Sequence, residues 1–201
     1  MTLTRRAALL AALLPATAMA ADQDAAAPIQ ALDQALQSNM QAGRSTPFPQ
    51  RFDKMAPVVE RAFDLPYILQ ESVGLRWKSL PADQQQALLD TFRKFTVAQY
   101  VANFDQNKGD RLEILPDNRI LGADQVVATR IVPQSGEPTR IDYVMRRTPT
   151  GWRAIDVLLN GSISQVAVNR SDWRSSLATG AGPLVDNLRS KVQSLSGGAL
   201  N

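Results

Sequence analysis

The spacing of apolar residues changes twice along this chain. From residue 29 to about residue 104, apolar side chains recur every three or four positions, which places them on one face of successive helices. Between residues 107 and 159 they fall into short runs, and some of these alternate with polar residues as strands do. The helical spacing returns from about residue 162. The pattern predicts an α+β domain in which N- and C-terminal helices flank a central sheet.

Each predicted helix has an apolar stripe and a residue that starts or stops it. The predicted helices cover residues 29–40, 52–63, 65–73, 81–104, 162–178 and 183–195. Pro57 is expected to kink or shorten the second helix, and the Asp64 carboxylate is expected to cap the third. The fourth helix has the widest apolar face, so the rest of the domain should cover most of it.

The central region predicts strands joined by short connections, which favour hairpins over crossover helices. The predicted strands cover residues 111–115, 125–132, 139–147 and 152–159. The segment Thr148-Pro149-Thr150-Gly151 has the composition of a type I turn, so the last two strands should form a hairpin. We therefore expect a small, mostly antiparallel sheet of about four strands.

The first 20 residues have the composition of a secretory signal peptide. Arg5 and Arg6 precede a short apolar stretch, and Ala18-Met19-Ala20 is a small-x-small cleavage motif. The stretch is shorter than the roughly 20 residues that span a membrane, so we expect removal after Ala20. Residues 21–28 are predicted as a linker and residues 29–201 as a single domain. The expected location is the periplasm, through the general secretory or the twin-arginine route.

The absence of two residue types limits the chemistry. The chain has 201 residues with no Cys and no His, which excludes thiol nucleophiles, disulfides, imidazole metal ligands and a Ser-His-Asp triad. The net charge of +3 becomes +1 (3 − 2) without Arg5 and Arg6, so nucleic acid is not an expected partner. Asp105, Asp110 and Glu113 lack the spacing of a calcium loop, and neither a metal nor a cofactor is predicted.

Two charged residues lie in apolar surroundings. Asp156 is within the predicted strand 152–159, and Arg170 is on the predicted inward face of helix 162–178. Each would be costly to bury without a partner, so we expect an ion pair that joins the sheet to the helix. The alternative is a polar anchor for an anionic ligand group, for which arginine is well suited.

Four segments carry a family resemblance. They are FDLPYILQESVGLRWKSLP (63–81), QALLDTFRKFTVAQY (86–100), GWRAIDVLLNG (151–161) and the pair Arg170-Ser171 in the helix that follows. Their order and spacing resemble the MlaC family of periplasmic phospholipid-binding proteins, once called toluene-tolerance auxiliary proteins, over about residues 29–195. Residues 67–74, 100–105 and 195–199 look most like the hopanoid-associated HpnM branch of that family.

The resemblance implies a soluble carrier that takes a membrane lipid into an apolar cavity between a curved sheet and its helices, without covalent chemistry. The implied cargo is phospholipid or a hopanoid-type lipid. The implied partners are an inner-membrane transporter, of the RND or ABC type, and an outer-membrane donor or acceptor of lipid. The residues expected to line the cavity are Leu65, Tyr67, Ile68, Val73, Trp77, Phe92, Phe95, Tyr100, Tyr143 and Val157. Periodicity alone favours a filled core at the aromatic positions on the long helix and in the strands.

Two other functions remain open from the residues themselves. One is a small proton-transfer enzyme with Asp64 or Asp156 as base and Tyr67 or Tyr143 as acid, because a carboxylate in an apolar pocket can have a raised pKa. The other is an adaptor that binds exporter subunits without cargo. Extraction of bound lipid from the purified protein would distinguish the carrier from both.

Overall fold

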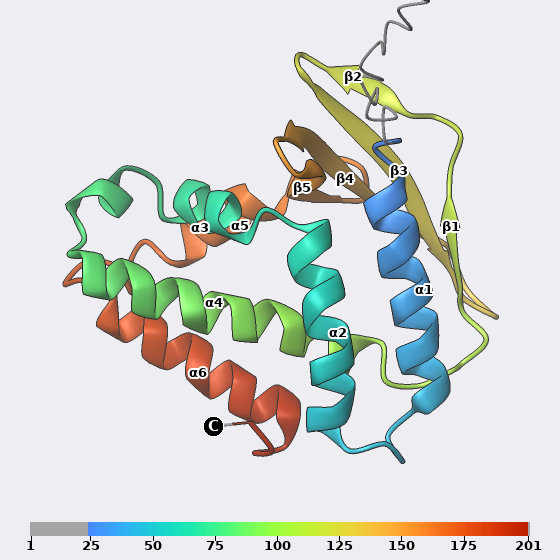
Figure 1. Cartoon of the computed structure of the whole chain (residues 1–201), viewed down its shortest axis with the longest axis horizontal. Helices are drawn as coiled ribbons and strands as arrows, with labels where there is room; N and C mark the ends of the chain where they lie inside the picture. Colours follow the sequence, from blue (N-terminus) through green and yellow to red (C-terminus); the bar gives the residue numbers. More distant parts are fainter. Residues whose placement is uncertain (1–23, 201) are drawn as a thin grey trace, which may run out of the picture.

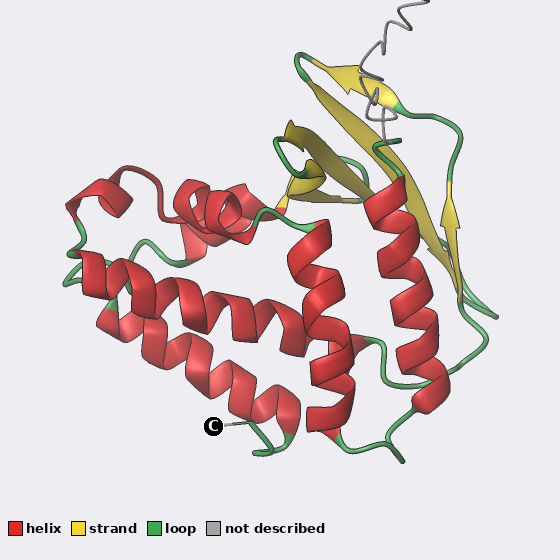
Figure 2. Cartoon of the chain, in the orientation of Figure 1, coloured by secondary structure: helices red, strands yellow, loops and turns green. Residues whose placement is uncertain are grey.

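The computed structural model describes residues 24–200. The strands gather at one end of the molecule, and α4 and α6 extend side by side away from them (Figures 1 and 2). The helices are α1 (Ala27–Ala42), α2 (Phe48–Ala62), α3 (Leu65–Val73), the 3-10 helix η1 (Gly74–Ser79), α4 (Ala82–Asn103), α5 (Gln165–Asp172) and α6 (Gly182–Ser196).

The strands form one antiparallel sheet in the order β1-β3-β4-β5-β6, with β2 also paired to β3. Their bounds are β1 (Arg111–Ile114), β2 (Arg119–Leu121), β3 (Asp124–Val132), β4 (Thr139–Thr148), β5 (Gly151–Leu159) and β6 (Ile163–Ser164). The predicted α+β fold with an antiparallel sheet is confirmed. The sequence does not reveal β2 and β6, because runs of three and two residues are too short to show an alternation.

The register of the central strands decides which side chains share a face of the sheet. Tyr143 of β4 lies directly opposite Val127 of β3 and Val157 of β5. Residues opposite each other point to the same face, and neighbours along a strand point to opposite faces. Tyr143 and Asp142 therefore serve different faces of the sheet. We call the face of Tyr143 the inner face and the face of Asp142 the outer face.

Of the local features predicted to shape the second and third helices, the Asp64 cap is confirmed and the shortening at Pro57 is not. Asp64 caps α3 as predicted, because its Oδ1 accepts a hydrogen bond from the backbone N–H of Tyr67 at 3.1 Å. The helix ends before Gly74, whose φ of 68° is the left-handed conformation that glycine permits. Pro57 does not shorten α2, which runs on to Ala62. Pro57 is exposed, so water can hydrate the carbonyl that the proline leaves unpaired.

The hydrophobic core joins the helices to the inner face of the sheet. Apolar positions at helical spacing supply its helical part, as the sequence predicts for the first, fourth and last helices. The most deeply buried of these are Ile29, Leu32 and Leu36 of α1, Leu88, Val97 and Val101 of α4, and Leu184 and Leu188 of α6. Because the wide apolar face of α4 is covered from several sides, this helix forms the centre of the domain.

The predicted helix 162–178 is wrong in extent. Ile163 belongs to β6, where it pairs with Leu159 of β5, and it is 48% exposed rather than inward. The helix α5 covers only Gln165–Asp172, and turns follow it. Trp173 and Leu177 are buried as predicted, although neither belongs to this helix. Backbone pairing across the turn at residues 160–162 overrides the helical spacing of the side chains.

The boundary between linker and domain also needs correction. The predicted signal peptide and the first residues of the predicted linker lie outside the described residues. Ala25 and Ala26 are only 2% and 3% exposed and pack in the core, and α1 begins at Ala27. The domain therefore starts before residue 29. Alanine is common both in linkers and in tightly packed contacts, so its composition alone does not mark the boundary.

Candidate functional site

A cavity of about 660 Å³ lies between the inner face of the sheet and helices α3, α4 and α5. Its volume is within the range of roughly 300 to 1,000 Å³ that is usual for sites of small organic molecules. Met40 of α1, Phe63 between α2 and α3, Lys191 of α6 and the loop that follows α4 complete the lining. The cavity is therefore a candidate ligand site within the domain.

Ile131 of β3 and two cross-strand pairs of β4 and β5 form the sheet wall of the cavity. Tyr143 lies opposite Val157, and Ile141 lies opposite Leu159. All four line the cavity because paired residues, and residues two positions apart on a strand, share one face. The sequence analysis identifies Tyr143 and Val157 but not the second pair. The alternation in both strands is the signal that could have found Ile141 and Leu159.

Three aromatic rings lie close together in the cavity wall. The ring of Phe63 is 5.6 Å from that of Tyr100 and 6.0 Å from that of Tyr143, measured between centroids. Burial raises the pKa of the Tyr100 hydroxyl, which the neighbouring Tyr143 hydroxyl raises further, and burial also raises the pKa of Tyr143. Both hydroxyls therefore stay protonated and uncharged around neutral pH.

A carboxylate lies near these tyrosines without lining the cavity. Asp33 of α1 interacts electrostatically with Tyr100 and Tyr143, and burial raises its pKa to about 6. The sequence analysis does not identify it. Asp33 follows Ile29 by four positions, and that spacing on the buried side of α1 is the signal that could have found it.

Most of the residues predicted to line a ligand cavity come together in this one. The structure places seven of them in its lining: Leu65, Ile68, Phe92, Phe95, Tyr100, Tyr143 and Val157. They come from α3, α4, β4 and β5, which are distant in sequence. Their contact with a ligand stays a prediction, but the cavity they were expected to share is present.

The cavity lining does not include Tyr67, Val73 or Trp77, and the prediction is corrected for these three. Tyr67 lies two positions after Leu65, so it points to the opposite side of α3. There it packs with a second apolar cluster, and the guanidinium of Arg146 lies 4.7 Å from its ring centroid. Val73 is buried in the main core, and Trp77 packs against that core from η1.

The expected ion pair between Asp156 and Arg170 is wrong. Asp156 accepts hydrogen bonds from the Ser164 hydroxyl and from the backbone N–H groups of Val157 (2.8 Å) and Val166 (3.1 Å). Its charge is satisfied within this local turn. Asp156 therefore attaches the beginning of α5 to β5.

Arg170 attaches the other end of the same helix to α3. Its Nε donates to the backbone carbonyl of Glu71 at 2.8 Å, and Nη2 lies 3.2 Å from the Glu71 carboxylate. Its side chain is 49% exposed, because α5 is short and turns this position outward. Neither Arg170 nor Asp156 lines the cavity, so the alternative role as a polar anchor for a ligand is not supported either.

The polar part of the lining contains residues that the sequence analysis does not assign to a ligand cavity. They are mainly amides and charged side chains: Gln99, Asn103, Gln106, Gln165, Asn169, Asp105, Lys108, Asp110, Asp172 and Lys191. A search for apolar stripes passes over such positions, although their helical spacing on α4 and α5 is regular. Among residues 24–200, no group of three acidic side chains is arranged to hold a metal ion.

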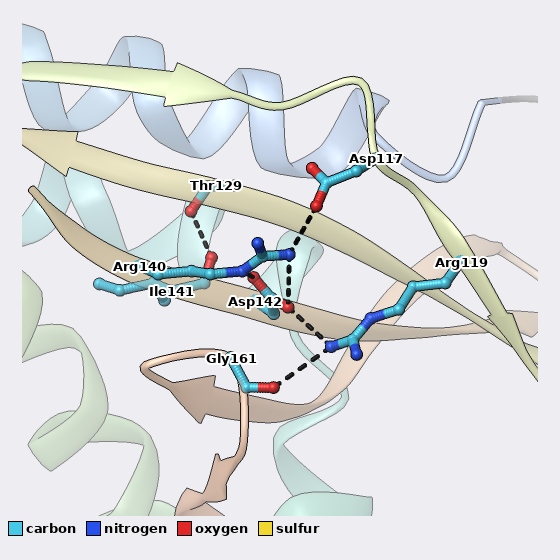
Figure 3. A network of polar contacts seen from close by, with 7 residues as sticks. All are labelled: Asp117, Arg119, Thr129, Arg140, Ile141, Asp142 and Gly161. Carbon is cyan, nitrogen blue, oxygen red and sulfur yellow. Dashed lines mark hydrogen bonds and ion pairs between the residues drawn. The ribbon is translucent and has the colours of Figure 1, made fainter.

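A separate network of charges lies on the outer face of the sheet (Figure 3). Asp142 is fully buried and accepts hydrogen bonds from Arg119 and Arg140, both at 2.8 Å. Arg140 also pairs with Asp117, and Arg119 donates to the carbonyl of Gly161 at 3.2 Å. The network connects β2 and β4 to the turn between β5 and β6 and does not reach the cavity.

Comparisons with known proteins identify the family. The fold is similar to the solved structure of the phospholipid-binding protein from Ralstonia solanacearum in complex with a phospholipid, with a TM-score of 0.72 and 22% sequence identity over 86% of this chain and 99% of that chain. Among curated proteins no sequence matches. In the part of the chain that the structure describes, no helix is both long and apolar enough to cross a membrane. Residues 30–191 match the MlaC protein family, so this chain belongs to that family.

Proposed function

We propose that this protein is a lipid carrier that holds the apolar part of a membrane lipid in the cavity, without covalent chemistry. The observation that carries the proposal is the lining of aliphatic and aromatic side chains between the sheet and α4. Each methylene group that leaves water contributes about 0.8 kcal/mol, so an acyl chain or fused-ring body can bind tightly without an ionic anchor. Family membership and the phospholipid in the Ralstonia solanacearum protein support the same conclusion.

The cargo that we propose is a phospholipid or a hopanoid-type polycyclic lipid. The resemblance of residues 67–74, 100–105 and 195–199 to the hopanoid-associated HpnM branch supports the polycyclic alternative. A rigid ring body and a flexible acyl chain place different demands on cavity shape, so the inner face of the sheet should decide between them.

The carrier is proposed to work in the periplasm, between an inner-membrane transporter of the RND or ABC type and an outer-membrane donor or acceptor. The signal-like residues 1–20 and the family support this location, with cleavage after Ala20. N-terminal sequencing of the protein recovered from the periplasm tests the processing step. Recovery of the intact Met1 form in washed membranes would contradict it.

The enzyme alternative has less support from the geometry. Asp64 caps α3 and Asp156 is occupied by local donors, so neither candidate base lines the cavity beside Tyr143. Burial raises the pKa of Tyr143, which makes it a weaker acid, and Tyr67 lies outside the cavity. A cargo-free adaptor would have no use for a cavity of this size.

Native mass spectrometry of the protein isolated from its own periplasm tests the carrier proposal. The expected result is an added mass that organic solvent removes and that fragmentation identifies as a lipid. A protein that purifies empty, and that takes up neither phospholipid nor hopanoid from vesicles, would contradict the proposal. The enzyme and adaptor alternatives would then gain weight.

A further inference from the structure

Two pairs of amide side chains line the cavity from different helices. Gln99 and Asn103 belong to α4, and Gln165 and Asn169 belong to α5. Each pair is separated by four positions, so its two members lie one above the other on the same helical face. Both helices therefore present a Gln and an Asn together to the same cavity.

These four side-chain amides have no hydrogen-bond partner among the described residues. Gln99, Gln165 and Asn169 are half-buried, and Asn103 is exposed at the end of α4. An amide has two N–H donors and a carbonyl acceptor, and half-buried polar groups normally find partners in the protein, in water or in a ligand. The amides are thus available to a polar group that enters the cavity.

The amides lie toward one end of the cavity. On α4 the lining changes along the helix from Phe92 and Phe95 to Gln99 and Asn103. The Phe92 ring contacts Trp173, which directly follows α5, at 5.9 Å between centroids. Phe92 and Trp173 therefore meet at one end of the two helices, and the amides of both helices lie away from it, where Tyr100 also lines the cavity. An amphiphile would place its apolar body at the aromatic end and its polar group at the amide end.

The charged groups of the lining provide no surplus of positive charge. Asp105 is paired with Arg44 outside the lining, at 2.6 Å. The other charged residues of the lining are two lysines, Lys108 and Lys191, and two aspartates, Asp110 and Asp172, so their formal charges sum to zero. An anionic headgroup needs charged donors for strong binding, and this balance offers it no net attraction.

We propose, on the basis of the lipid-carrier function above, that the amide end of the cavity binds an uncharged, hydroxyl-rich lipid headgroup in preference to an anionic one. A hydroxyl both donates and accepts hydrogen bonds, and so does an amide, whereas a phosphate oxygen only accepts. Gln99 of α4 and Asn169 of α5 line the cavity from two walls and are half-buried, so both should contribute to the selection.

Competitive loading tests the proposal. Delipidated protein is incubated with vesicles that contain equal amounts of glucosyl diacylglycerol, phosphatidylethanolamine and phosphatidylglycerol with identical acyl chains. Lipid bound to the protein is then quantified by mass spectrometry after the vesicles are removed. We expect the glucosyl lipid to exceed phosphatidylglycerol by about threefold or more, which corresponds to about one net hydrogen bond.

A double variant tests how much the amide side chains contribute to the headgroup preference. Gln99→Met with Asn169→Leu keeps the side-chain size and should reduce the ratio of bound glucosyl lipid to bound phosphatidylglycerol to near one. The matched control is Gln37→Met with Asn187→Leu, two exposed positions on α1 and α6 that do not line the cavity. The control should keep the wild-type preference, and circular dichroism checks the fold of both.

The outcomes distinguish this proposal from the carrier function. Equal loading of the glucosyl and anionic lipids by the wild-type protein, or an unchanged preference in the double variant, would overturn the headgroup proposal and leave the carrier function standing. Absence of uptake from all vesicles would overturn both.

Discussion

The two faces of strand β4 use polar groups in opposite ways. On the outer face, the buried Asp142 is held by two arginines, and each of those has a further protein partner. On the inner face, Tyr143 borders a cavity whose amides have no partner among the described residues. Asp142 and Tyr143, adjacent residues of one strand, thus have different roles. The outer face satisfies its charges within the protein and stabilises the sheet, whereas the inner face leaves space and hydrogen-bonding groups for a ligand.

The largest expected effect comes from breaking the outer network. Asp142→Asn removes a fully buried charge from between Arg119 and Arg140. We expect the free energy of unfolding to fall by about 2 to 3 kcal/mol. Breaking a fully buried ion pair costs about 3 to 5 kcal/mol, and the cost should be smaller here because both arginines are partly exposed to water. Urea unfolding measures this change. Lipid bound per folded protein should not change.

Asp117→Asn is the matched control within the same network. The Asp117 side chain is 51% exposed and water screens its charge, so its pairing with Arg140 should contribute much less to stability than Asp142 does. Equal losses in the two variants would show that burial does not distinguish them. Loss of bound lipid in folded Asp142→Asn would contradict the separation of the two faces.

Two substitutions of valine by tryptophan sharpen the contrast between cavity and core. Val157→Trp adds volume inside the cavity and should reduce bound lipid severalfold with a small change in stability. Val73→Trp adds the same volume to the packed core and should cost about 1 to 3 kcal/mol of stability without direct loss of lipid. The lipid-to-protein ratio of the folded fraction and its thermal unfolding test both.

Leu75→Trp serves as the control for these variants, because Leu75 is 98% exposed on η1. It should match the wild-type protein in both measurements. Loss of bound lipid in Val73→Trp with unchanged stability would contradict this contrast. It would show that the cavity extends further along α3 than its lining indicates.

The fold was predictable where local signals decide the structure. Asp64 as a cap and the turn at Thr148–Gly151 act within a few residues, and both are where the sequence indicates. The extent of the helix after Gly161 was not predictable from the sequence. The backbone pairing of Ile163 with Leu159 across a turn makes Ile163 part of a strand, although its side chain fits the helical spacing. Long-range pairing is information that periodicity does not contain.

The site divides in the same way. The apolar lining could be predicted in large part because residues such as Phe92 and Tyr143 lie on amphipathic elements that must face something apolar. Tyr67 was misplaced because resemblance identifies a segment and not the side of a short helix that faces the cavity. The partners of Arg170 and Asp156 depend on how α5 sits against α3 and β5, which no single segment reveals.

A smaller effect is expected from pH at the boundary of the inner face. The pKa of Asp33 is raised from its ordinary value near 3.8 to about 6, so folding favours the protonated form. This contribution to stability is complete below about pH 4 and is lost as the pH rises through 6. Asp33→Asn should therefore raise the free energy of unfolding at pH 7.5 by about 1 to 2 kcal/mol, an estimate reduced for partial exposure.

Urea unfolding at pH 4 and pH 7.5 measures the effect of Asp33→Asn. The two proteins should be nearly equal in stability at pH 4 and differ at pH 7.5. Asp53→Asn, at an exposed position on α2, is the control and should run parallel to the wild-type protein. A gain of the same size at both pH values would point to improved packing instead of a relieved charge.

The smallest effect expected is the coupling between Asp156 and Arg170, which the structure attaches to different partners. Asp156→Asn weakens the hydrogen bonds at the start of α5, and Arg170→Met removes the contact with Glu71 at its end. Each single substitution should cost about 1 kcal/mol, and the double substitution should cost their sum to within about 0.5 kcal/mol, because the two share no partner. A double-mutant cycle by urea unfolding measures this term. An interaction free energy above about 1 kcal/mol would contradict this expectation. It would indicate either a direct contact between Asp156 and Arg170 or detachment of the whole of α5 when either end is released.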